Sequence, residues 1–228
     1  MSQVDIVIPA YNCADYTVRC LRSVAAHTDN YRVILIDNGS DPDQREQILA
    51  ALAELPHKLI TNKENLGFVK ATNQGITASR SAPYVCLLNN DTEVRENWVA
   101  MLLEPFRDSQ CGIVGPAATQ GGWQARQQRP SPSKYQRLGA LNLAFFCALI
   151  SRRVIKRVGL LDEGYGMGFG DDDDYCERVK AAGFRLYFRR DLVITHNHRT
   201  TFERHIPNWR EAQRENIARF TGKWGRRP

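Results

Sequence analysis

The amino-acid sequence predicts an α/β fold, with a mostly parallel central sheet flanked by helices. The first observation is a series of short apolar runs rich in β-branched residues, such as VDIVIPA (4–10). Runs of this kind are typical of parallel strands that are covered on both faces. The second observation is that longer segments with apolar residues at helical spacing separate these runs. This alternation indicates strand–helix–strand units joined by right-handed crossovers.

Four strands and three helices are expected before about residue 115. Asp41 precedes Pro42, a pairing typical of a helix start, and we expect that helix to run to about Leu55. The helices before and after it are ADYTVRCLRSVAAHT and GFVKATNQGITASR. The expected strands are 4–10, 32–38, 57–62 and one within 82–94.

The alternation breaks in the second half of the chain. Residues 119–137 are polar and rich in Gly, Gln, Pro and Arg, which predicts a long mobile loop and a candidate lid. A strand and a short helix follow in LNLAFFCALISRRVIKRVG, and then a helix at 172–182 that Gly183 ends. One or two strands in FRLYFRRDLVITHNH and a last helical pattern complete the chain. We expect one domain, 1–228, whose two regions meet near residue 115.

The chain is basic, with a formal net charge of +6. Basic residues gather at 124–137, at 151–157 and in the tail GKWGRRP, and they suit nucleotide phosphates, an anionic membrane or nucleic acid. The six cysteines form no CxxC pair, which favours buried free thiols in a reducing cytosol. No apolar run is long enough to cross a bilayer, and the amino terminus resembles no secretion signal. We therefore expect a cytoplasmic protein.

Polar side chains follow each of the four expected strands. Open parallel sheets bind their ligands beyond the carboxyl ends of the strands. Taken alone, each of these side chains is more typical of a turn or a helix cap. Because four strand ends coincide, we expect a ligand site there. The side chains are Tyr11 and Asn12, Asp37 and Asn38, Asn62 and Asn65, and Asn89, Asn90 and Asp91.

Phosphate groups cannot be held by the familiar glycine-rich loops. PAYNCAD (9–15) lacks GxGxxG, and no GxxxxGK[ST] occurs in the chain. A divalent metal is the simple alternative. Asn89 and Asp91 stand two residues apart at a strand end, where their oxygen atoms suit Mg²⁺ or Mn²⁺.

Six motifs together carry a family resemblance. VDIVIPAYN, IDNGSDP, NLGFVKATNQGI, LLNNDTEV, FGDDDDYCERVKAAGFRLYF and THNHRTTF occur in the order of family 2 glycosyltransferases with the Rossmann-like GT-A fold. The chain resembles this family over roughly 4–115 and 143–202. The resemblance implies an inverting hexosyl or deoxyhexosyl transfer from a nucleotide diphosphate sugar, aided by Mn²⁺ or Mg²⁺. It also implies that 1–115 binds the nucleotide sugar, and that 116–228 forms a smaller acceptor-side and catalytic region.

The acceptor in the resembling family is most often a growing surface polysaccharide or a lipid-linked saccharide. We therefore expect a role in polysaccharide biosynthesis, with peripheral association at the inner face of the membrane as an open alternative. By the same resemblance, Asp37 reads the nucleotide base, where uracil and thymine fit equally well. The expected nucleotide contacts are Pro9, Ala10, Tyr11, Asn12, Asp37, Asn38, Gly39, Asn65, Lys70, Asn89 and Asn90.

NND (89–91) matches the family's metal motif, in which two aspartates often flank a variable residue. The first position here is Asn89, and a neutral amide binds a cation more weakly than a carboxylate. Asp91 is therefore expected to carry most of the coordination. The resemblance implies that His196 completes the metal site, with His198 as the rival candidate.

The run Asp171–Asp174 matches the family stretch that holds the general base. Asp172 falls on the base position, and Asp171 replaces a glutamate beside it. Successive helical residues point about 100° apart, so the four carboxylates cannot all face one cleft. Asp174 stands four residues before Arg178 and is expected to form a surface ion pair. Asp173 is expected to be solvated.

Three other functions stay open at this stage. Nucleic acid could be the acceptor, through the basic 124–137 segment. A binding module without turnover is favoured by Asn89. A nucleotidyltransferase would want a glycine-rich basic loop after the first strand, which PAYNC is not. Trp123, Tyr165 and Phe169 are candidates either to stack on a sugar or to pack in the core.

Overall fold

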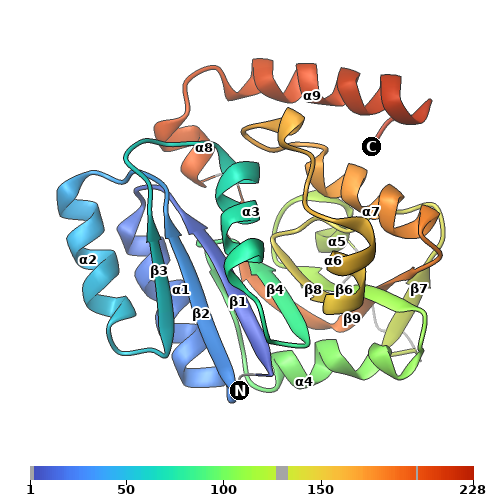
Figure 1. Ribbon diagram of the computed structural model, residues 1–228, viewed down its shortest axis with the longest axis horizontal. Helices are drawn as coiled ribbons and strands as arrows, with labels where there is room; N and C mark the ends of the chain where they lie inside the picture. The colour runs from blue at the N-terminus through green and yellow to red at the C-terminus, as the bar shows by residue number, and fades with distance from the viewer. Residues whose placement is uncertain (1–2, 127–132, 199) are drawn as a thin grey trace.

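The computed structural model describes residues 3–126, 133–198 and 200–228. Within those residues one nine-stranded sheet runs through the molecule, with helices on both faces (Figure 1). The strand order is β3-β2-β1-β4-β8-β6-β9-β5, and β7 pairs with β9. The predicted α/β architecture is confirmed.

The first half of the chain has the predicted alternation. β1 (Val4–Ala10), β2 (Tyr31–Asp37), β3 (His57–Thr61) and β4 (Tyr84–Leu88) pair in parallel. The helices between them are α1 (Ala14–His27), α2 (Pro42–Leu52) and α3 (Phe68–Ala78). Asp41 and Pro42 do begin α2, but the helix ends at Leu52, three residues before the expected end.

The second half is mixed in direction, because β8 lies antiparallel between β4 and β6. β9 pairs in parallel with β6 and antiparallel with β5 and β7. The strands are β5 (Thr92–Glu93), β6 (Cys111–Ala118), β7 (Tyr135–Leu138), β8 (Cys147–Ser151) and β9 (Arg185–His196). The helices are α4 (Trp98–Leu103), α5 (Gly122–Arg126), α6 (Arg152–Val158), α7 (Asp171–Ala181), α8 (Thr200–His205) and α9 (Trp209–Trp224), with 3-10 turns at Glu104–Arg107 and Glu163–Tyr165.

The loop predicted at 119–137 is wrong for much of its length. Residues 122–126 form α5, and 135–138 form the edge strand β7. Gln124 is buried and fixes α5, because its side-chain amide donates to Pro116 O (2.7 Å) and accepts from Ala144 N (2.6 Å). Residues 127–132, the centre of the candidate lid, lie outside the described residues.

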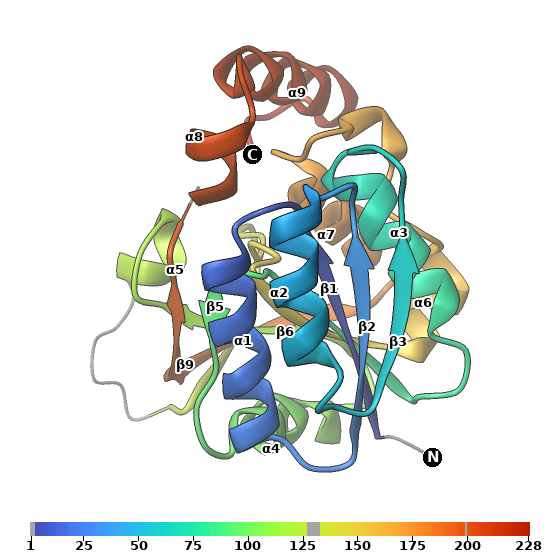
Figure 2. The same cartoon turned by 90° about the vertical axis from the view of Figure 1, so that its left-hand side faces the viewer.

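Two hydrophobic clusters fill the two faces of the sheet. One packs beneath α1, α2 and α4, and the other beneath α3, α6, α7 and α9. Figure 2 shows α1 and α2 covering one face, with α8 and α9 above the carboxyl ends of the parallel strands. All six cysteines are free and buried, as predicted. Among the described residues, no helix is long and apolar enough to cross a membrane.

Candidate functional site

A pocket opens at the carboxyl ends of the parallel strands, and both regions of the chain line it. The first region contributes Pro9, Ala10, Tyr11, Asn38, Asn65, Phe68, Asn89, Asn90 and Asp91. The second contributes Ala144, Phe145, Phe146, Met167, Gly168, Phe169, Asp171, Asp172, His196, His198, Thr201, Phe202 and Ile206. Most of the predicted site residues therefore meet in one place. Four of them, Asn12, Asp37, Gly39 and Lys70, lie outside the lining.

Asn12 joins the ends of the first two strands. Its side chain donates to Asp41 Oδ2 (3.1 Å) and accepts from Asp41 N (2.8 Å), while its backbone N–H donates to Ser40 Oγ (2.9 Å). Asn12 has a left-handed backbone (φ 50), a conformation that asparagine tolerates better than most residues. Asn12 thereby fixes the turn that carries Tyr11 into the pocket.

Asp37 is fully buried and already has partners. Its carboxylate accepts from Ser40 N (3.0 Å) and forms an ion pair with Arg45. Gly39 follows with φ 84, and a Cβ there would lie 2.5 Å from Glu64 C. Only glycine fits this crossing of two loops. Lys70 is exposed on α3.

Asn38 connects the second and third strand ends through its side-chain amide. Its Oδ1 accepts from Asn62 Nδ2 (2.9 Å) and Leu66 N (3.1 Å), and its Nδ2 donates to Asn65 Oδ1 (2.8 Å). Asn38 and Asn65 line the pocket, whereas Asn62 does not. The hydrogen bonds among these asparagines thus stabilise the wall of the pocket, and Asn38 and Asn65 also line it.

Asn89, Asp91 and His196 form one corner of the pocket. β5 pairs Thr92 with His196, which brings the histidine beside the NND turn. His196 Nε2 lies 3.4 Å from Asp91 Oδ1. The imidazole stacks on Phe146, with ring centroids 4.8 Å apart and planes 13° apart. The ring is therefore held in one orientation, with an edge toward the carboxylate.

This corner fits a divalent cation through its unsatisfied oxygen atoms. Asn89 Oδ1 and Asp91 Oδ1 are buried and accept no hydrogen bond, and buried acceptors of this kind normally have a partner. Carboxylate and amide oxygen atoms suit Mn²⁺ or Mg²⁺. Among the described residues, no three His, Cys, Asp or Glu side chains converge as a ligand group. An ion at this corner would need further oxygen atoms, from a molecule bound in the pocket, to complete its coordination.

His198 also lines the pocket, two residues after His196 in the chain. Its ring centroid is 5.5 Å from that of His196, in an edge-on arrangement. Gly121 packs against it so closely that a Cβ there would lie 2.7 Å from the ring. The observed contact with Asp91 is that of His196, whose Nε2 lies 3.4 Å from Asp91 Oδ1.

The four consecutive aspartates have four different environments. Asp171 is buried in the pocket wall, and its Oδ2 has no hydrogen-bond partner. Asp172 also lines the pocket, and its carboxylate accepts from Asp173 N (2.9 Å) and from the backbone of Phe145. Asp174 points away into the protein. The run therefore presents two carboxylates to the pocket.

Two expectations about the other aspartates are wrong. Asp174 does pair with Arg178 (2.8 Å), but the pair is not on the surface, because Asp174 is 0% exposed. Asp174 also accepts from Trp224 Nε1 (2.9 Å) and pairs with Lys223 Nζ (2.7 Å). Asp173 is half-buried, and its carboxylate hydrogen-bonds the side chain of Asn142. The predictions of a surface ion pair for Asp174 and of a solvated Asp173 are wrong because the local sequence does not reveal the packing of α9 and of Asn142.

Burial dominates the acidity of the aspartates that face the pocket. Desolvation raises the pKa of Asp171 to about 7, and the nearby Asp173 carboxylate adds to the effect. Desolvation also raises the pKa of Asp172 well above its usual range, followed by repulsion from Asp173 and Asp171. A carboxylate with a raised pKa is a stronger base, which suits it to accept a proton near neutral pH.

The candidate aromatic residues divide between the pocket and the core. Phe169 lines the pocket and packs on Phe202 (4.7 Å between ring centroids). Trp123 donates to Asn142 O (2.8 Å) and packs on Phe188, and Tyr165 is buried in the core. Sequence reasoning missed Phe145, Phe146 and the residues of α8, because isolated apolar residues carry no chemical signal.

The family model described as Glycosyl transferase family 2 matches residues 5–159. The chain belongs to this family. Its structure is similar to that of GalNAc-T7 determined with UDP, GalNAc and Mn²⁺, with a TM-score of 0.77, 17% identity, and coverage of 98% of this chain and 49% of that one. It is also similar to a mannosyltransferase from Pyrobaculum calidifontis determined with GDP-Man and Mn²⁺ (TM-score 0.74, 16% identity, 99% and 66% coverage). These likenesses confirm the GT-A fold.

Curated relatives include the pre-mycofactocin glycosyltransferase of Mycobacterium tuberculosis, 27% identical over 86% of this chain and 43% of that protein. Glycosyltransferase AglE of Haloferax volcanii is 26% identical over 85% of this chain and 66% of that protein. The chain is thus similar to enzymes of the predicted class. It spans less than half the length of the mycobacterial relative.

Proposed function

We propose that this family 2 domain transfers a sugar, with inversion, from a nucleotide diphosphate sugar to a hydroxyl of a saccharide or lipid-linked saccharide. The observation that carries the proposal is that Asp91 and Asp172 face the same pocket from opposite regions of the chain. Asp91 stands at the end of the parallel half of the sheet, and Asp172 begins α7. A donor bound at Asp91 would present its sugar toward Asp172.

Asp172 is the proposed general base. Its carboxylate would accept the proton of the acceptor hydroxyl as that oxygen attacks the anomeric carbon of the donor. The bond to the diphosphate breaks on the opposite face, so the configuration of the anomeric carbon inverts. Backbone N–H groups of Asp173 and Phe145 hold the carboxylate in place. Asp171 lies beside it, and the proximity of a second carboxyl tunes its basicity.

Asn89, Asp91 and His196 are the residues proposed to hold a divalent cation. When bound, the cation would supply positive charge to the departing diphosphate. Pro9, Ala10, Tyr11, Asn38, Asn65 and Asn90 are proposed to contact the nucleotide directly. Asp37 is proposed to read the base, as a uracil or thymine imide would require, although in this structure its carboxylate is engaged by Arg45 and Ser40 N. Asn12 and Gly39 are proposed to act by shaping the loops.

A thermal-shift panel with UDP, dTDP, GDP and their sugars, each with and without Mn²⁺, tests the proposal. Ligand at about 100 times its Kd should stabilise the protein by about 2.7 kcal/mol. GDP belongs in the panel because the Pyrobaculum neighbour holds GDP-Man. We expect one nucleotide to raise the Tm, with a larger shift when Mn²⁺ is present. Absence of any shift across the panel would contradict the proposal.

A binding module without turnover is the second candidate, and Asn89 favours it. The corner offers one carboxylate and one imidazole, with a neutral amide as the third ligand. Nucleotide binding without release of nucleoside diphosphate from any donor would support the module.

We also propose that the protein rests on anionic membrane in the cell, near its acceptor. Arg153, Lys156 and Arg157 are exposed on α6, and Arg226 and Arg227 are exposed in the tail. Each basic residue near an anionic surface contributes about 1 kcal/mol. Sedimentation with phosphatidylglycerol vesicles, but not with phosphatidylcholine vesicles, is the expected result. Equal sedimentation with both would contradict it.

A further inference from the structure

The segment before α7 has an unusual backbone. Gly166, Gly168, Phe169 and Gly170 all have positive φ, at 47°, 109°, 72° and 88°. Phe169 has a side chain, so its left-handed conformation costs roughly 1–2 kcal/mol. Strained residues of this kind persist only where their surroundings hold them, and they gather at functional sites.

This segment forms a wall of the pocket and leads directly into the aspartates. Met167, Gly168 and Phe169 line the pocket. Gly170 O accepts the backbone N–H of Asp174 (2.9 Å), which begins the hydrogen-bond ladder of α7. The position of the segment therefore sets where the first turn of α7, with Asp172, meets the pocket.

One buried side chain of α9 forms hydrogen bonds to this segment. Asn216 Nδ2 donates to Tyr165 O (2.8 Å) and to Gly168 O (2.7 Å). A side-chain amide has two N–H donors, and here both are used on two carbonyl groups of one turn. Asn216 is 8% exposed, so water cannot readily replace these bonds.

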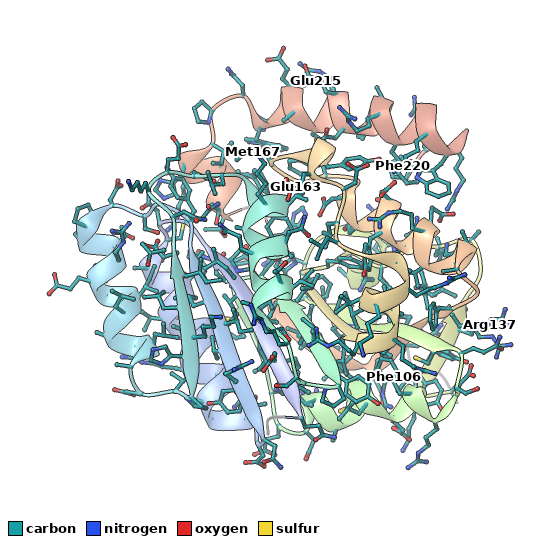
Figure 3. The ribbon with its side chains drawn as sticks, viewed as in Figure 1. Phe106, Arg137, Glu163, Met167, Glu215 and Phe220 are labelled. Carbon is teal, nitrogen blue, oxygen red and sulfur yellow. The ribbon has the colours of Figure 1, made fainter. Side chains whose placement is uncertain are left out.

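The other side of the segment contacts the donor region. Val69 N, in the first turn of α3, donates to Gly166 O (3.1 Å). Gly67 has φ 87, and a Cβ there would lie 2.8 Å from Gly166 O. Figure 3 shows Met167 at the top of α3, beneath α9, with Glu215 pointing away from it. The segment is thus held between α3 and α9.

We propose that Asn216 is a positioning residue, which fixes the 165–168 turn and thereby the distance between the donor site and the Asp172 carboxylate. The expected effect of Asn216 on catalysis rests on the proposed function. It concerns α9, which lies outside the 5–159 match to the family model. Its physical basis is the pair of hydrogen bonds from one buried amide.

The test compares Asn216→Ala with the wild-type protein in two measurements. Hydrogen–deuterium exchange should rise in 164–172 and stay unchanged in the strands of the sheet. The kcat for UDP release from UDP-glucose with Mn²⁺ should fall by about 10- to 100-fold, because a small misplacement of reacting groups has effects of this size. The Kd for UDP with Mn²⁺, from calorimetry, should stay within about twofold.

Three further variants separate the effect of losing the two N–H donors from other effects of a substitution in α9. Asn216→Gln keeps the two N–H donors and should recover part of kcat. Asn216→Asp keeps the shape but loses the donors, so it should be no better than alanine. Arg214→Ala, at an exposed position of the same helix, should match the wild type in both measurements.

Unchanged exchange in 164–172, or an unchanged kcat, overturns the proposal. A loss of kcat and UDP affinity in equal proportion also overturns it, because general unfolding would explain that result. If the wild-type protein releases no nucleotide from any donor, the proposed function fails on its own. Exchange in 164–172 then decides whether Asn216 holds the turn.

Discussion

At the scale of single residues, the run Asp171–Asp174 shows how environment gives one side chain different roles. Asp172 faces the pocket, with its carboxylate held by two backbone N–H groups. Asp174 faces the core and accepts from Arg178 and Trp224. Charge at the start of a helix is favoured by its dipole, but that effect alone would not bury two of the four carboxylates. The buried positions follow from contacts made by other segments.

The raised pKa values predict the pH dependence of transfer. Protonated Asp172 cannot accept a proton, so turnover should be low at acidic pH and rise with pH as the cluster ionises. Asp171→Asn removes one of the charges that raise the pKa of Asp172, so the acid limb should move to lower pH. The profile of kcat/KM between pH 5 and 9 measures this shift. An acid limb that stays in place, or moves to higher pH, would count against the coupling.

Asn89 makes a prediction about metal affinity. Asn89→Asp places a second carboxylate beside Asp91, and cation affinity rises with the number of charged ligands. The Mn²⁺ concentration for half-maximal stabilisation should fall by about tenfold, equivalent to about 1.4 kcal/mol. Thermal shift at fixed nucleotide concentration gives this value. Weaker Mn²⁺ binding in the variant would mean that Asn89 does not face the ion.

At the scale of elements, α7 and α9 depend on each other. Trp224 and Lys223 of α9 reach the buried Asp174 of α7, and Asn216 reaches the turn before it. These contacts explain why a helix with few apolar residues docks here. They also mean that the element bearing the proposed base is held in place by residues more than 40 positions later in the chain.

Asp174→Asn tests the junction between these helices. The substitution removes the carboxylate that pairs with Arg178, and it leaves Lys223 with only its second partner, Asp162 (3.0 Å). Because Asp174 is buried, the free energy of unfolding should fall by about 3 kcal/mol. Asp172→Asn should instead raise the free energy of unfolding at pH 8. The pKa of Asp172 is raised by burial, so its ionised form destabilises the fold above that pKa, and a neutral side chain removes this cost.

Urea unfolding at pH 8, followed by circular dichroism, measures both changes. Asp29→Asn is the matched control, because Asp29 is exposed between α1 and β2, and it should change stability by less than about 0.5 kcal/mol. Equal destabilisation by Asp172→Asn and Asp174→Asn would show that the two environments do not differ as described.

At the scale of the whole molecule, the parallel half of the sheet could be predicted because each strand is a continuous apolar run. The meeting of Asp91 with Asp172 could be predicted only from the family resemblance, since the two residues are 81 positions apart in the chain. The predicted loop at 119–137 was wrong because α5 and β7 are short and polar, and they gain their stability from contacts such as that of Gln124 with Pro116. The roles of α8 and Asn216 had no local signal.

The division of the chain near residue 115 and the roles of the site residues stay predictions. The sheet itself is continuous, since β6 spans Cys111–Ala118 and joins β8 and β9. What the fold provides is one pocket between two carboxylate-bearing elements. The proposed function therefore requires that Asp172 acts on a donor that the other region binds.

The most direct measurement separates binding from turnover in Asp172→Asn. Calorimetry with the stabilising nucleotide and Mn²⁺ gives the affinity, and release of the nucleoside diphosphate gives the rate. We expect an affinity within about twofold of the wild type, and a rate lower by about 10²- to 10⁴-fold, the contribution typical of a general base. A variant that retains wild-type turnover, or that loses nucleotide binding together with turnover, would contradict the role assigned to Asp172.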